Sequence, residues 1–284
     1  MSDQSSKVSV IIPTYNQAEL LQNALISVIN QTMQDWEAIV IDNNSRDNTR
    51  EVVEAFNDPR IRYVPFSNKG IIAASRNHGI HLAAGEYIAF LDSDDLWYAS
   101  KLATCRDHLG PDTDIVCHGL RIRREAGLKE SLIPNLPGHD IYHFLLDNGN
   151  ASIATSAVML KKEYLSQFGI FSEKPEMVTA EDYELWLRLS KKRIRWGCIK
   201  EELGEYRIHG GNASGNIKRQ MLAEEAAVMM HFNEDYPSSA AGTRLKMKRR
   251  RVMIALRAGK RALDSGFFKD ALNYSLQGIT KIWT

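Results

Sequence analysis

Two hydrophobic patterns alternate along the first 95 residues of the chain. One is a short, nearly continuous apolar run, which is typical of a strand covered on both faces and occurs at residues 7–13, 36–41, 61–64 and 87–91. The other places an apolar residue at every third or fourth position, which is the spacing of an amphipathic helix and occurs at residues 20–29, 52–56 and 71–84. Gly85 is expected to cap the third of these helices. Strands and helices that alternate in this way predict parallel βαβ units.

The pattern is less regular after residue 95. Helices are expected at residues 96–109 and 181–191, and short strands at residues 114–118, 156–160 and 195–199. Glycine and proline recur between residues 125 and 150, so loops should dominate there. From residue 217 onward the pattern is helical, with interruptions that predict three helices. We therefore predict an α/β domain over residues 1–215 and a helical C-terminal extension over residues 216–284.

Composition and charge add little to this picture. The 284 residues are 44% hydrophobic and 25% charged, which is ordinary for a soluble globular protein. The formal charge of +1 gives no reason to expect nucleic acid as a partner. Cys105, Cys117 and Cys198 lack metal-ligand spacing, which suggests free thiols in a reducing compartment. Because the start lacks the apolar segment of a signal peptide and no uncharged apolar run reaches about 18 residues, we expect a cytoplasmic protein.

Three carboxylates, those of Asp92, Asp94 and Asp95, follow the fourth apolar run within four residues. Side chains of a strand alternate between its faces, so Asp92 and Asp94 should point the same way, with Ser93 turned aside. Two carboxylates on one side repel each other unless a cation lies between them. This arrangement predicts a metal site at the carboxyl edge of the sheet. The alternative is an acidic turn that caps the following helix.

Polar or aromatic residues also follow the first three apolar runs. The ends of neighbouring parallel strands lie side by side and form a cleft. Tyr15 can pack on a nucleotide base there, and Asp42 can accept hydrogen bonds from a base or a ribose. The alternatives are a partly buried aromatic for Tyr15 and a turn-forming residue for Asp42. Arg76, in the helical segment before the acidic run, can bind a phosphate with two hydrogen bonds or form a surface salt bridge instead.

Four segments, in the same order and spacing, resemble the family 2 glycosyltransferases. They are Val8-Ser-Val-Ile-Ile-Pro-Thr-Tyr-Asn16, Val40-Ile-Asp-Asn-Asn-Ser45, Ala74-Ser-Arg-Asn-His-Gly-Ile80 and Gly85-Glu-Tyr-Ile-Ala-Phe-Leu-Asp-Ser-Asp-Asp95. The similarity extends from about residue 7 to residue 214. It implies a GT-A fold, with a mixed, mainly parallel sheet flanked by helices. It also implies an inverting transfer from a nucleotide-diphosphate sugar, assisted by a divalent cation, Mn²⁺ or Mg²⁺.

The resemblance also assigns roles to individual residues. It implies nucleotide-binding functions for Pro13, Thr14, Tyr15, Asp42, Asn43, Arg76, Asp92, Ser93 and Arg207. Asp94 is the expected direct metal ligand, and Asp92 is expected to contact the ribose or the metal. Many relatives have a second Asp where this chain has Asn43, so the identity of the base is left open.

The catalytic base of the family falls in a Glu-Asp pair, which here is Glu181-Asp182 at the start of a predicted helix. Inversion requires the acceptor hydroxyl to attack from the face opposite the leaving diphosphate, so a carboxylate on the acceptor side must remove its proton. A helix N-terminus keeps that carboxylate ionised. We expect Asp182 to be the base and Glu181 to orient the acceptor or the loop. The alternative is an acidic pair that only favours the helix dipole.

A further element, Arg207-Ile-His209 followed by Asn212 and Ser214, resembles the Arg-x-His segment of the family. In relatives the histidine approaches the metal or the diphosphate, and the arginine binds phosphate. Neutral imidazole suits manganese beside carboxylates, which makes His209 a third candidate metal ligand. The alternative is a structural histidine in a loop.

The C-terminal segment lies outside the resemblance. Residues 244–261 contain nine Lys or Arg and no acid, and the apolar residues around them recur at helical spacing. Such basic, amphipathic helices can lie on an anionic membrane, at the inner face of the cell membrane, where a lipid-linked acceptor is found. The alternatives are a helical cap that packs on the catalytic domain and a contact in a homodimer.

These observations together predict an inverting glycosyltransferase that moves a sugar to a hydroxyl of a glycan, and the resemblance implies a role in surface polysaccharide synthesis. One alternative is a sugar nucleotidyltransferase, although residues 13–17 lack its glycine-rich, basic phosphate loop. The other is a non-catalytic glycan-binding or scaffold protein. The joint presence of Asp92, Asp94 and Asp182 argues against this second alternative.

Overall fold

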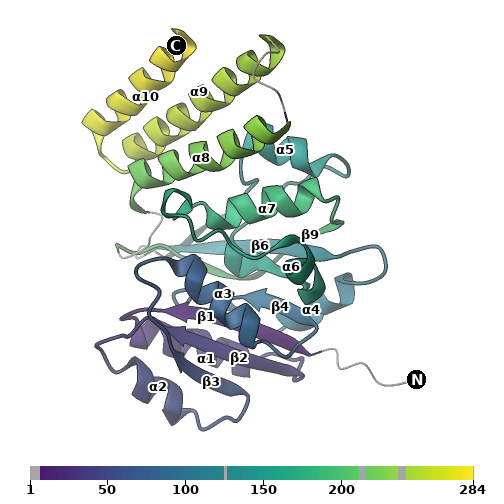
Figure 1. Ribbon diagram of the computed structural model, residues 1–284. Helices are drawn as coiled ribbons and strands as arrows, with labels where there is room; N and C mark the ends of the chain where they lie inside the picture. Colours follow the sequence, from purple (N-terminus) through teal and green to yellow (C-terminus); the bar gives the residue numbers. More distant parts are fainter. Residues whose placement is uncertain (1–6, 125–126, 211–214, 236–240, 284) are drawn as a thin grey trace. The chain divides into compact units, whose positions relative to one another are not determined.

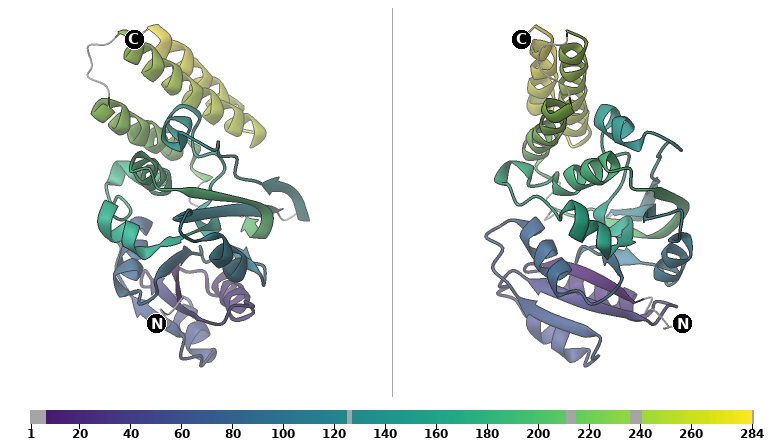
Figure 2. Two further views of the ribbon diagram at one scale, coloured as in Figure 1. Left: turned by 90° about the vertical axis from the view of Figure 1, so that its right-hand side faces the viewer. Right: turned by 45° about the vertical axis from the view of Figure 1, so that its right-hand side comes forward.

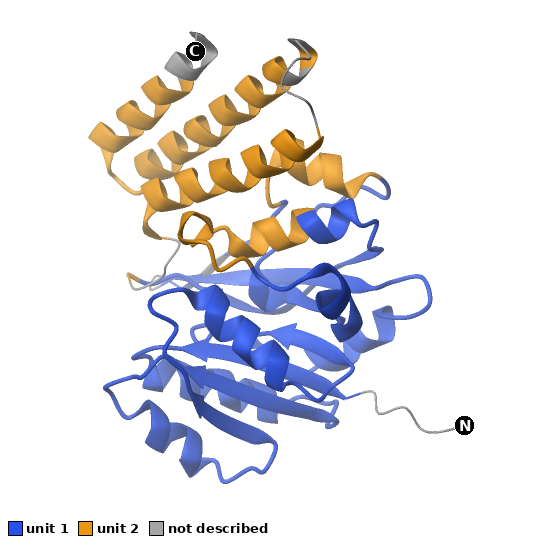
Figure 3. Cartoon of the chain, in the orientation of Figure 1, with its two compact units in different colours: residues 1–139, 151–171, 188–209 blue, residues 140–150, 172–187, 210–284 orange. Residues whose placement is uncertain are grey.

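The computed structural model describes residues 7–124, 127–210, 215–235 and 241–283 (Figure 1). The chain divides into two compact units (Figure 3). The first unit contains residues 1–139, 151–171 and 188–209, and the second contains residues 140–150, 172–187 and 210–284. Each unit is therefore assembled from separate stretches of the chain. The predicted domain boundary at residues 215 and 216 stays a prediction.

The described part of the first unit contains a nine-stranded mixed sheet. Four parallel strands form one side of it in the order β3-β2-β1-β4, with bounds β1 (Val8–Thr14), β2 (Trp36–Asp42), β3 (Ile61–Pro65) and β4 (Tyr87–Phe90). The sheet continues from β4 through β8 (Val158–Lys161), β6 (Ile115–Arg124), β9 (Trp196–Arg207) and β5 (Leu96–Trp97), and β7 (Gly127–Leu132) pairs with β6. Of these, β6 and β9 are parallel to each other, whereas β8 is antiparallel to both β4 and β6. The predicted α/β fold with a mixed sheet is confirmed.

Helices cover both faces of the parallel strands. One face carries α1 (Ala18–Ile29), α2 (Thr49–Ala55) and α4 (Lys101–His108), whose buried side chains join those of Val8, Val10 and Ile12 in one core. The other face carries α3 (Ile72–Leu82). There Gly79 lies so close to the sheet that a Cβ atom would come within 2.6 Å of Ile11 Cγ2. This close contact fixes α3, and with it Arg76, against β1 and β2.

The register of the parallel strands aligns the ends that carry candidate residues. Thr14 pairs with Asp42, and Asp42 pairs with Pro65. The first three strands therefore end at one edge of the sheet, as the sequence predicts.

Three local predictions are wrong. Gly85 does not cap α3, because the helix ends at Leu82 and Ala83 is the cap residue. Gly85 is instead needed where the chain passes β1, since a Cβ atom would lie 2.5 Å from the Lys7 carbonyl oxygen. The helix predicted at residues 96–109 is divided into β5 and α4, and the loop predicted at residues 125–150 contains β7 and α5 (Ile141–Asn148).

Helices dominate the second unit. Besides α5 it contains α8 (Ile217–Asp235), α9 (Ala241–Asp264), α10 (Phe268–Trp283) and the first seven residues of α7 (Glu181–Lys191). The three predicted C-terminal helices are thus present, and α9 and α10 run side by side as a hairpin in both views of Figure 2. Within the described residues, no helix is both long enough and apolar enough to cross a membrane. The described residues also form two short 3₁₀ helices, Thr155–Ala157 in the first unit and Pro175–Met177 in the second, and α6 (Lys162–Phe168) in the first unit.

Candidate active site

The acidic run lies in a turn beyond β4, rather than in the strand itself. The strand ends at Phe90, and the backbone N–H of Asp95 donates to the Asp92 carbonyl oxygen at 3.0 Å. The argument from strand alternation is therefore wrong for Asp92 and Asp94. The two carboxylates still act on each other, because burial first and the charge of Asp92 second raise the pKa of Asp94 above its ordinary value.

His209 follows β9 and reaches the same turn. Its Nε2 lies 3.0 Å from Oδ2 of Asp94, and this hydrogen bond lowers the pKa of the carboxyl, opposing the effect of burial. Both side chains are partly exposed, at 27% for His209 and 15% for Asp94, so a ligand can reach them. The fold thus brings together two of the three predicted metal ligands.

Asp95 holds this turn to the neighbouring elements. It is 1% exposed, and it accepts hydrogen bonds from the Ser156 hydroxyl at 2.6 Å and from the Arg207 backbone N–H at 3.0 Å. Ser156 Oγ in turn accepts from the backbone N–H of Asp92 at 3.0 Å. Burial raises the pKa of Asp95 well above its ordinary value, and the charges of Asp94 and Asp92 raise it further. Sequence reasoning assigned no role to Asp95 or Ser156.

Arg76 is buried and pairs with Asp92, which is partly exposed. Its Nη2 lies 2.7 Å from Asp92 Oδ1, the guanidinium packs 5.4 Å from the centre of the Phe171 ring, and only 3% of the side chain is exposed. The alternative for Arg76 was a surface salt bridge. Arg76 does form an ion pair, but its side chain is buried and does not lie at the surface. Phosphate binding by Arg76 stays a prediction.

The nucleotide edge combines an exposed ring with buried polar groups. Tyr15 is 51% exposed, so the alternative of a partly buried aromatic is wrong and its ring is accessible for stacking. Pro13 and Thr14 are buried in β1. Among the described residues, Thr14 Oγ1 finds no hydrogen-bond partner. Ser93 donates to Gln17 Oε1 at 2.6 Å, which links the acidic turn to the loop after β1. Gln17 is a further residue that sequence reasoning missed.

Asp42 forms a turn at the end of β2. It is 1% exposed, and it accepts hydrogen bonds from the backbone and hydroxyl of Ser45 and from the Tyr63 hydroxyl at 2.6 Å. Burial, together with this bond to Asp42, raises the pKa of Tyr63. The turn-forming alternative is therefore present, and contact with a base or ribose stays a prediction. Asn43 Oδ1 accepts from the backbone of Asn68 at 2.9 Å, which fixes the next loop.

Glu181 and Asp182 belong to the second unit, in the first turn of α7. Glu181 is buried and accepts from the Thr179 backbone N–H at 2.7 Å, whereas Asp182 is half-buried and accepts from the Tyr183 backbone N–H at 2.6 Å. Thr179 has a φ of +85°, which is rare for a β-branched residue and marks strain. The other predicted residues described above belong to the first unit, and Asn212 and Ser214 lie outside the described residues.

The residues present fit a cation that takes some of its ligands from the protein and the others from phosphates and water. In the part of the chain that the structure describes, no three His, Cys, Asp or Glu side chains form a metal-binding group. What the acidic turn offers is one carboxylate oxygen of Asp94 and one ring nitrogen of His209, with Asp92 next to them. Mg²⁺ in nucleotide sites uses one or two carboxylates and takes its other ligands from phosphates and water, and a carboxylate with an imidazole also suits Mn²⁺.

The comparison with protein families agrees with this site. The model of "Glycosyl transferase family 2" matches residues 9–169, which include the four parallel strands, except Val8 at the start of β1, and the acidic turn. The chain therefore belongs to glycosyl transferase family 2 and is a glycosyltransferase, rather than a nucleotidyltransferase or a scaffold protein.

Curated relatives show the same class. TuaG of Bacillus subtilis, a glycosyltransferase whose name assigns it provisionally to teichuronic acid biosynthesis, is 30% identical over 82% of this chain and 92% of its own length. The Escherichia coli enzyme WfgD, a UDP-Glc:α-D-GlcNAc-diphosphoundecaprenol β-1,3-glucosyltransferase, is 32% identical over 75% of this chain and 83% of its own. Family membership thus extends over most of the chain.

Solved structures confirm the GT-A fold. TarS residues 1–349 of S. aureus in complex with UDP-GlcNAc superimposes with a TM-score of 0.62 at 14% identity, covering 95% of this chain and 90% of that chain. The mannosyltransferase PcManGT of Pyrobaculum calidifontis, in complex with GDP-Man and Mn²⁺, gives a TM-score of 0.59 at 17% identity and covers 97% and 84%. At these identities the likeness concerns the fold alone.

Proposed function

We propose that this glycosyltransferase moves a sugar from a nucleotide-diphosphate sugar to a hydroxyl of a lipid-linked glycan, with inversion, during the synthesis of a surface polysaccharide. The observation that carries the proposal is the Asp94–His209 pair beside the ends of the parallel strands, in a chain of glycosyl transferase family 2. The lipid-linked acceptor is taken from the name of WfgD, and the surface polysaccharide from that of TuaG. We place the reaction on the cytoplasmic side, where nucleotide sugars are made.

The first unit is proposed to bind the donor. Asp94 and His209 would hold a divalent cation, with Asp92 at its edge, and the diphosphate would complete the coordination. When bound, the cation supplies positive charge that stabilises the leaving diphosphate. Tyr15 would stack on the base, beside the buried Thr14 and Asp42. The remaining members of the donor site are Pro13, Asn43, Arg76, Ser93 and Arg207.

The second unit is proposed to supply the catalytic base. Asp182 takes the proton from the acceptor hydroxyl while the oxygen forms a bond to the anomeric carbon and the bond from that carbon to the diphosphate breaks. A helix N-terminus favours the ionised carboxylate, and Asp182 lies in the first turn of α7. The strained backbone of Thr179 supports a functional role for this turn, and Glu181 orients the loop through its bond to Thr179.

A thermal-shift screen tests the donor side of this proposal. The protein is heated with UDP, GDP, ADP or CDP, each with and without MnCl₂. We expect one nucleotide to raise the melting temperature by roughly 5–10 °C at saturating concentration, and only when the cation is present. Asp94→Ala should remove the shift, and Asp107→Ala, an exposed acid on α4, should retain it. A chain that responds to none of these nucleotides, or responds equally without the cation, contradicts the proposed donor site.

A further inference from the structure

The α9–α10 hairpin exposes a row of large apolar side chains. On α9 the row contains Leu245, Leu256 and Leu263, which are 71%, 47% and 52% exposed. On α10 it contains Phe268, Leu272 and Leu276, which are 71%, 62% and 49% exposed. These residues are spaced by whole turns, so on each helix they share one face. We call these six side chains the apolar stripe.

Both halves of the apolar stripe lie on the same side of the hairpin. The helices pack through Gly259, which meets Ala271 and Ser275, and through Gly278, which meets Ala255. The side of each helix that contacts the other helix is its packing side. Viewed along each helix from its N-terminus, the apolar residues are rotated about the helix axis by roughly a quarter turn from the packing side, in the same direction on both helices. Because the two helices run in opposite directions, equal rotations bring the two rows to one side.

The opposite side of α9 faces α8. Arg250 Nη2 lies 2.7 Å from Glu224 Oε1, and Arg251 Nε lies 2.6 Å from Glu225 Oε1. Arg261, about three turns further along α9 than these pairs, donates to Gln220 of α8. The basic residues at 244–261 therefore fall into two groups. Arg250, Arg251 and Arg261 bond to α8 and stabilise the second unit.

Other cations lie alongside the apolar stripe. Arg249 and Lys260 of α9 and Lys269 of α10 are exposed, and among the described residues they form no ion pair or hydrogen bond. The α9 sequence contains one acid, Asp264, and Asp270 of α10 points toward Lys218 of α8, so the edge of the stripe carries a net positive charge. An exposed apolar face with cations at its edge has the chemistry of a helix pair that lies in the interface of an anionic bilayer.

We infer that the α9–α10 hairpin is a docking surface for an anionic lipid membrane. The apolar stripe would enter the boundary between headgroups and acyl chains, and Arg249, Lys260 and Lys269 would meet lipid phosphates. A second copy of the chain fits less well. A two-fold interface places the same patch on both sides, so two cationic edges would meet with few acids to pair with them.

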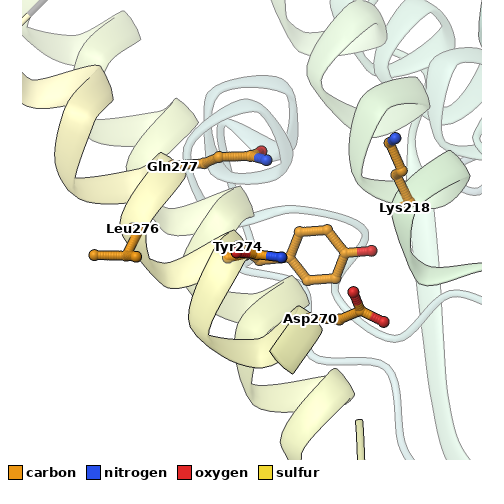
Figure 4. Close-up of a pocket in the computed structure, with 6 residues that line it drawn as sticks. Lys218, Asp270, Tyr274, Leu276 and Gln277 are labelled. Atoms are coloured by element: carbon orange, nitrogen blue, oxygen red, sulfur yellow. The ribbon is translucent and has the colours of Figure 1, made fainter. Parts of the chain in front are cut away.

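A groove of about 350 Å³ next to the hairpin does not contribute to this inference (Figure 4). Tyr274 and Asp270 point from α10 toward Lys218 of α8. Since the groove is lined by one basic and one acidic side chain, it adds no net positive charge for lipid phosphates.

Vesicle flotation of the full chain tests the inference. Vesicles of phosphatidylcholine alone are compared with vesicles that contain about 30% phosphatidylglycerol, at low and at high salt. We expect binding to the anionic vesicles only, at least tenfold above the neutral ones, and loss of most of it at about 0.5 M NaCl. The triple variants L256S/L263S/L272S and R249E/K260E/K269E should each lose at least tenfold.

The control variant R62E/K174E/K192E changes the charge equally at exposed positions of other elements and should bind more strongly than R249E/K260E/K269E. Unchanged circular dichroism and an unchanged melting temperature show that each variant is folded. Equal binding of all three variants overturns the inference. So does sedimentation that shows a dimer lost in L256S/L263S/L272S while vesicles do not bind, because the stripe would then be an interface between copies. Neither result depends on the transferase assay, so the proposed function is tested separately.

Discussion

Nε2 of His209 lies 3.0 Å from Oδ2 of Asp94, although 115 positions separate the two residues in the chain. This contact is a hydrogen bond, with one proton between the ring nitrogen and the carboxylate oxygen. A cation bound by both side chains must take the place of that proton, since a metal uses the same lone pairs. The hydrogen bond therefore holds the two side chains together at the position where we propose the cation.

Removal of either partner should weaken nucleotide binding only when the cation is present. We expect Asp94→Ala to reduce the affinity for the nucleoside diphosphate with Mn²⁺ by roughly 100-fold, and His209→Ala by roughly tenfold, because a carboxylate contributes more charge to the ion. Titration calorimetry with and without EDTA measures both values. His108→Ala, at an exposed position of α4, is the control. Equal losses with and without EDTA would show that these side chains contact the nucleotide directly.

Asp182→Asn should separate chemistry from binding. The amide cannot accept the proton of the acceptor hydroxyl, so the transfer rate should fall by roughly 1,000-fold or more. Donor binding should stay within about twofold, because Asp182 is proposed to act on the acceptor. Single-turnover kinetics and titration of the donor check the two parts. Glu181→Gln, which keeps an oxygen for the Thr179 N–H, should lose less activity.

The product of the same reaction gives an independent test of the mechanism. Direct displacement predicts an anomeric configuration opposite to that of the donor, which proton NMR of the product reports. A retained configuration would contradict both the direct displacement and the proposed role of Asp182 as the base in that displacement.

The sequence predicts the parallel half of the sheet well, because buried parallel strands are apolar along their whole length and their helices have a clear period. It fails where pairing is long-range. Leu96 and Trp97 form β5 by pairing with Glu205 and Gly204, where a Cβ atom on Gly204 would lie 2.3 Å from the Leu96 carbonyl oxygen. Nothing near residue 96 signals this partner.

The candidate site also contains some features with a local sequence signal and others that depend on long-range contacts. The acidic run is visible as a local cluster, and family resemblance alone connects it with His209. The Asp95–Ser156 bond joins residues 61 positions apart and has no local signal, since a serine near a short strand is common. A salt bridge was one alternative for Arg76, but neither its partner Asp92 nor the burial of its guanidinium beside the Phe171 ring had a local signal.

Lys101 provides a test of stability outside the site. Its side chain is completely buried in the first unit, and Nζ lies 3.7 Å from the centre of the Trp97 ring. Among the described residues, Nζ has no hydrogen-bond partner. Burial lowers the pKa of Lys101 from 10.5 to about 8, and a smaller effect of Cys105 opposes it. Lys101→Met should therefore stabilise the protein, by about 2 kcal/mol at pH 7, because it removes a buried charge.

The pH dependence of this effect has a definite sign. Between pH 8 and 10.5 the unfolded chain binds the proton at Lys101 and the folded chain does not, so the stability of the wild type rises with pH in this window. Below it both states are protonated, and the cost of burying the ammonium is complete. The advantage of Lys101→Met over the wild type should therefore shrink toward pH 10.5, as measured by urea unfolding. Lys192→Met, at an exposed position, should show no such trend.

Arg250 and Arg249 are neighbours on α9 with opposite environments, which allows a matched test of how α9 is held. Arg250 is 1% exposed, and it donates to the Leu146 carbonyl oxygen at 2.7 Å and to Glu224 at 2.7 Å. Its Nη2 also donates to the hydroxyl of Tyr183 at 3.3 Å, and Tyr183 is the residue that follows the proposed base Asp182 in the sequence. Arg250→Met leaves buried acceptors unpaired and should lower the free energy of unfolding by about 3 kcal/mol.

Arg249→Met removes an exposed charge by the same chemical change and should stay within about 0.5 kcal/mol of the wild type. Urea unfolding compares the two variants, and hydrogen exchange should increase over residues 145–150 in Arg250→Met alone, since these residues lose the donor to Leu146. If both variants unfold at the same urea concentration, the buried contacts of Arg250 contribute little to the stability of the second unit. A selective loss in Arg250→Met would mean that the C-terminal helices and the helix of Asp182 are stabilised by the same arginine.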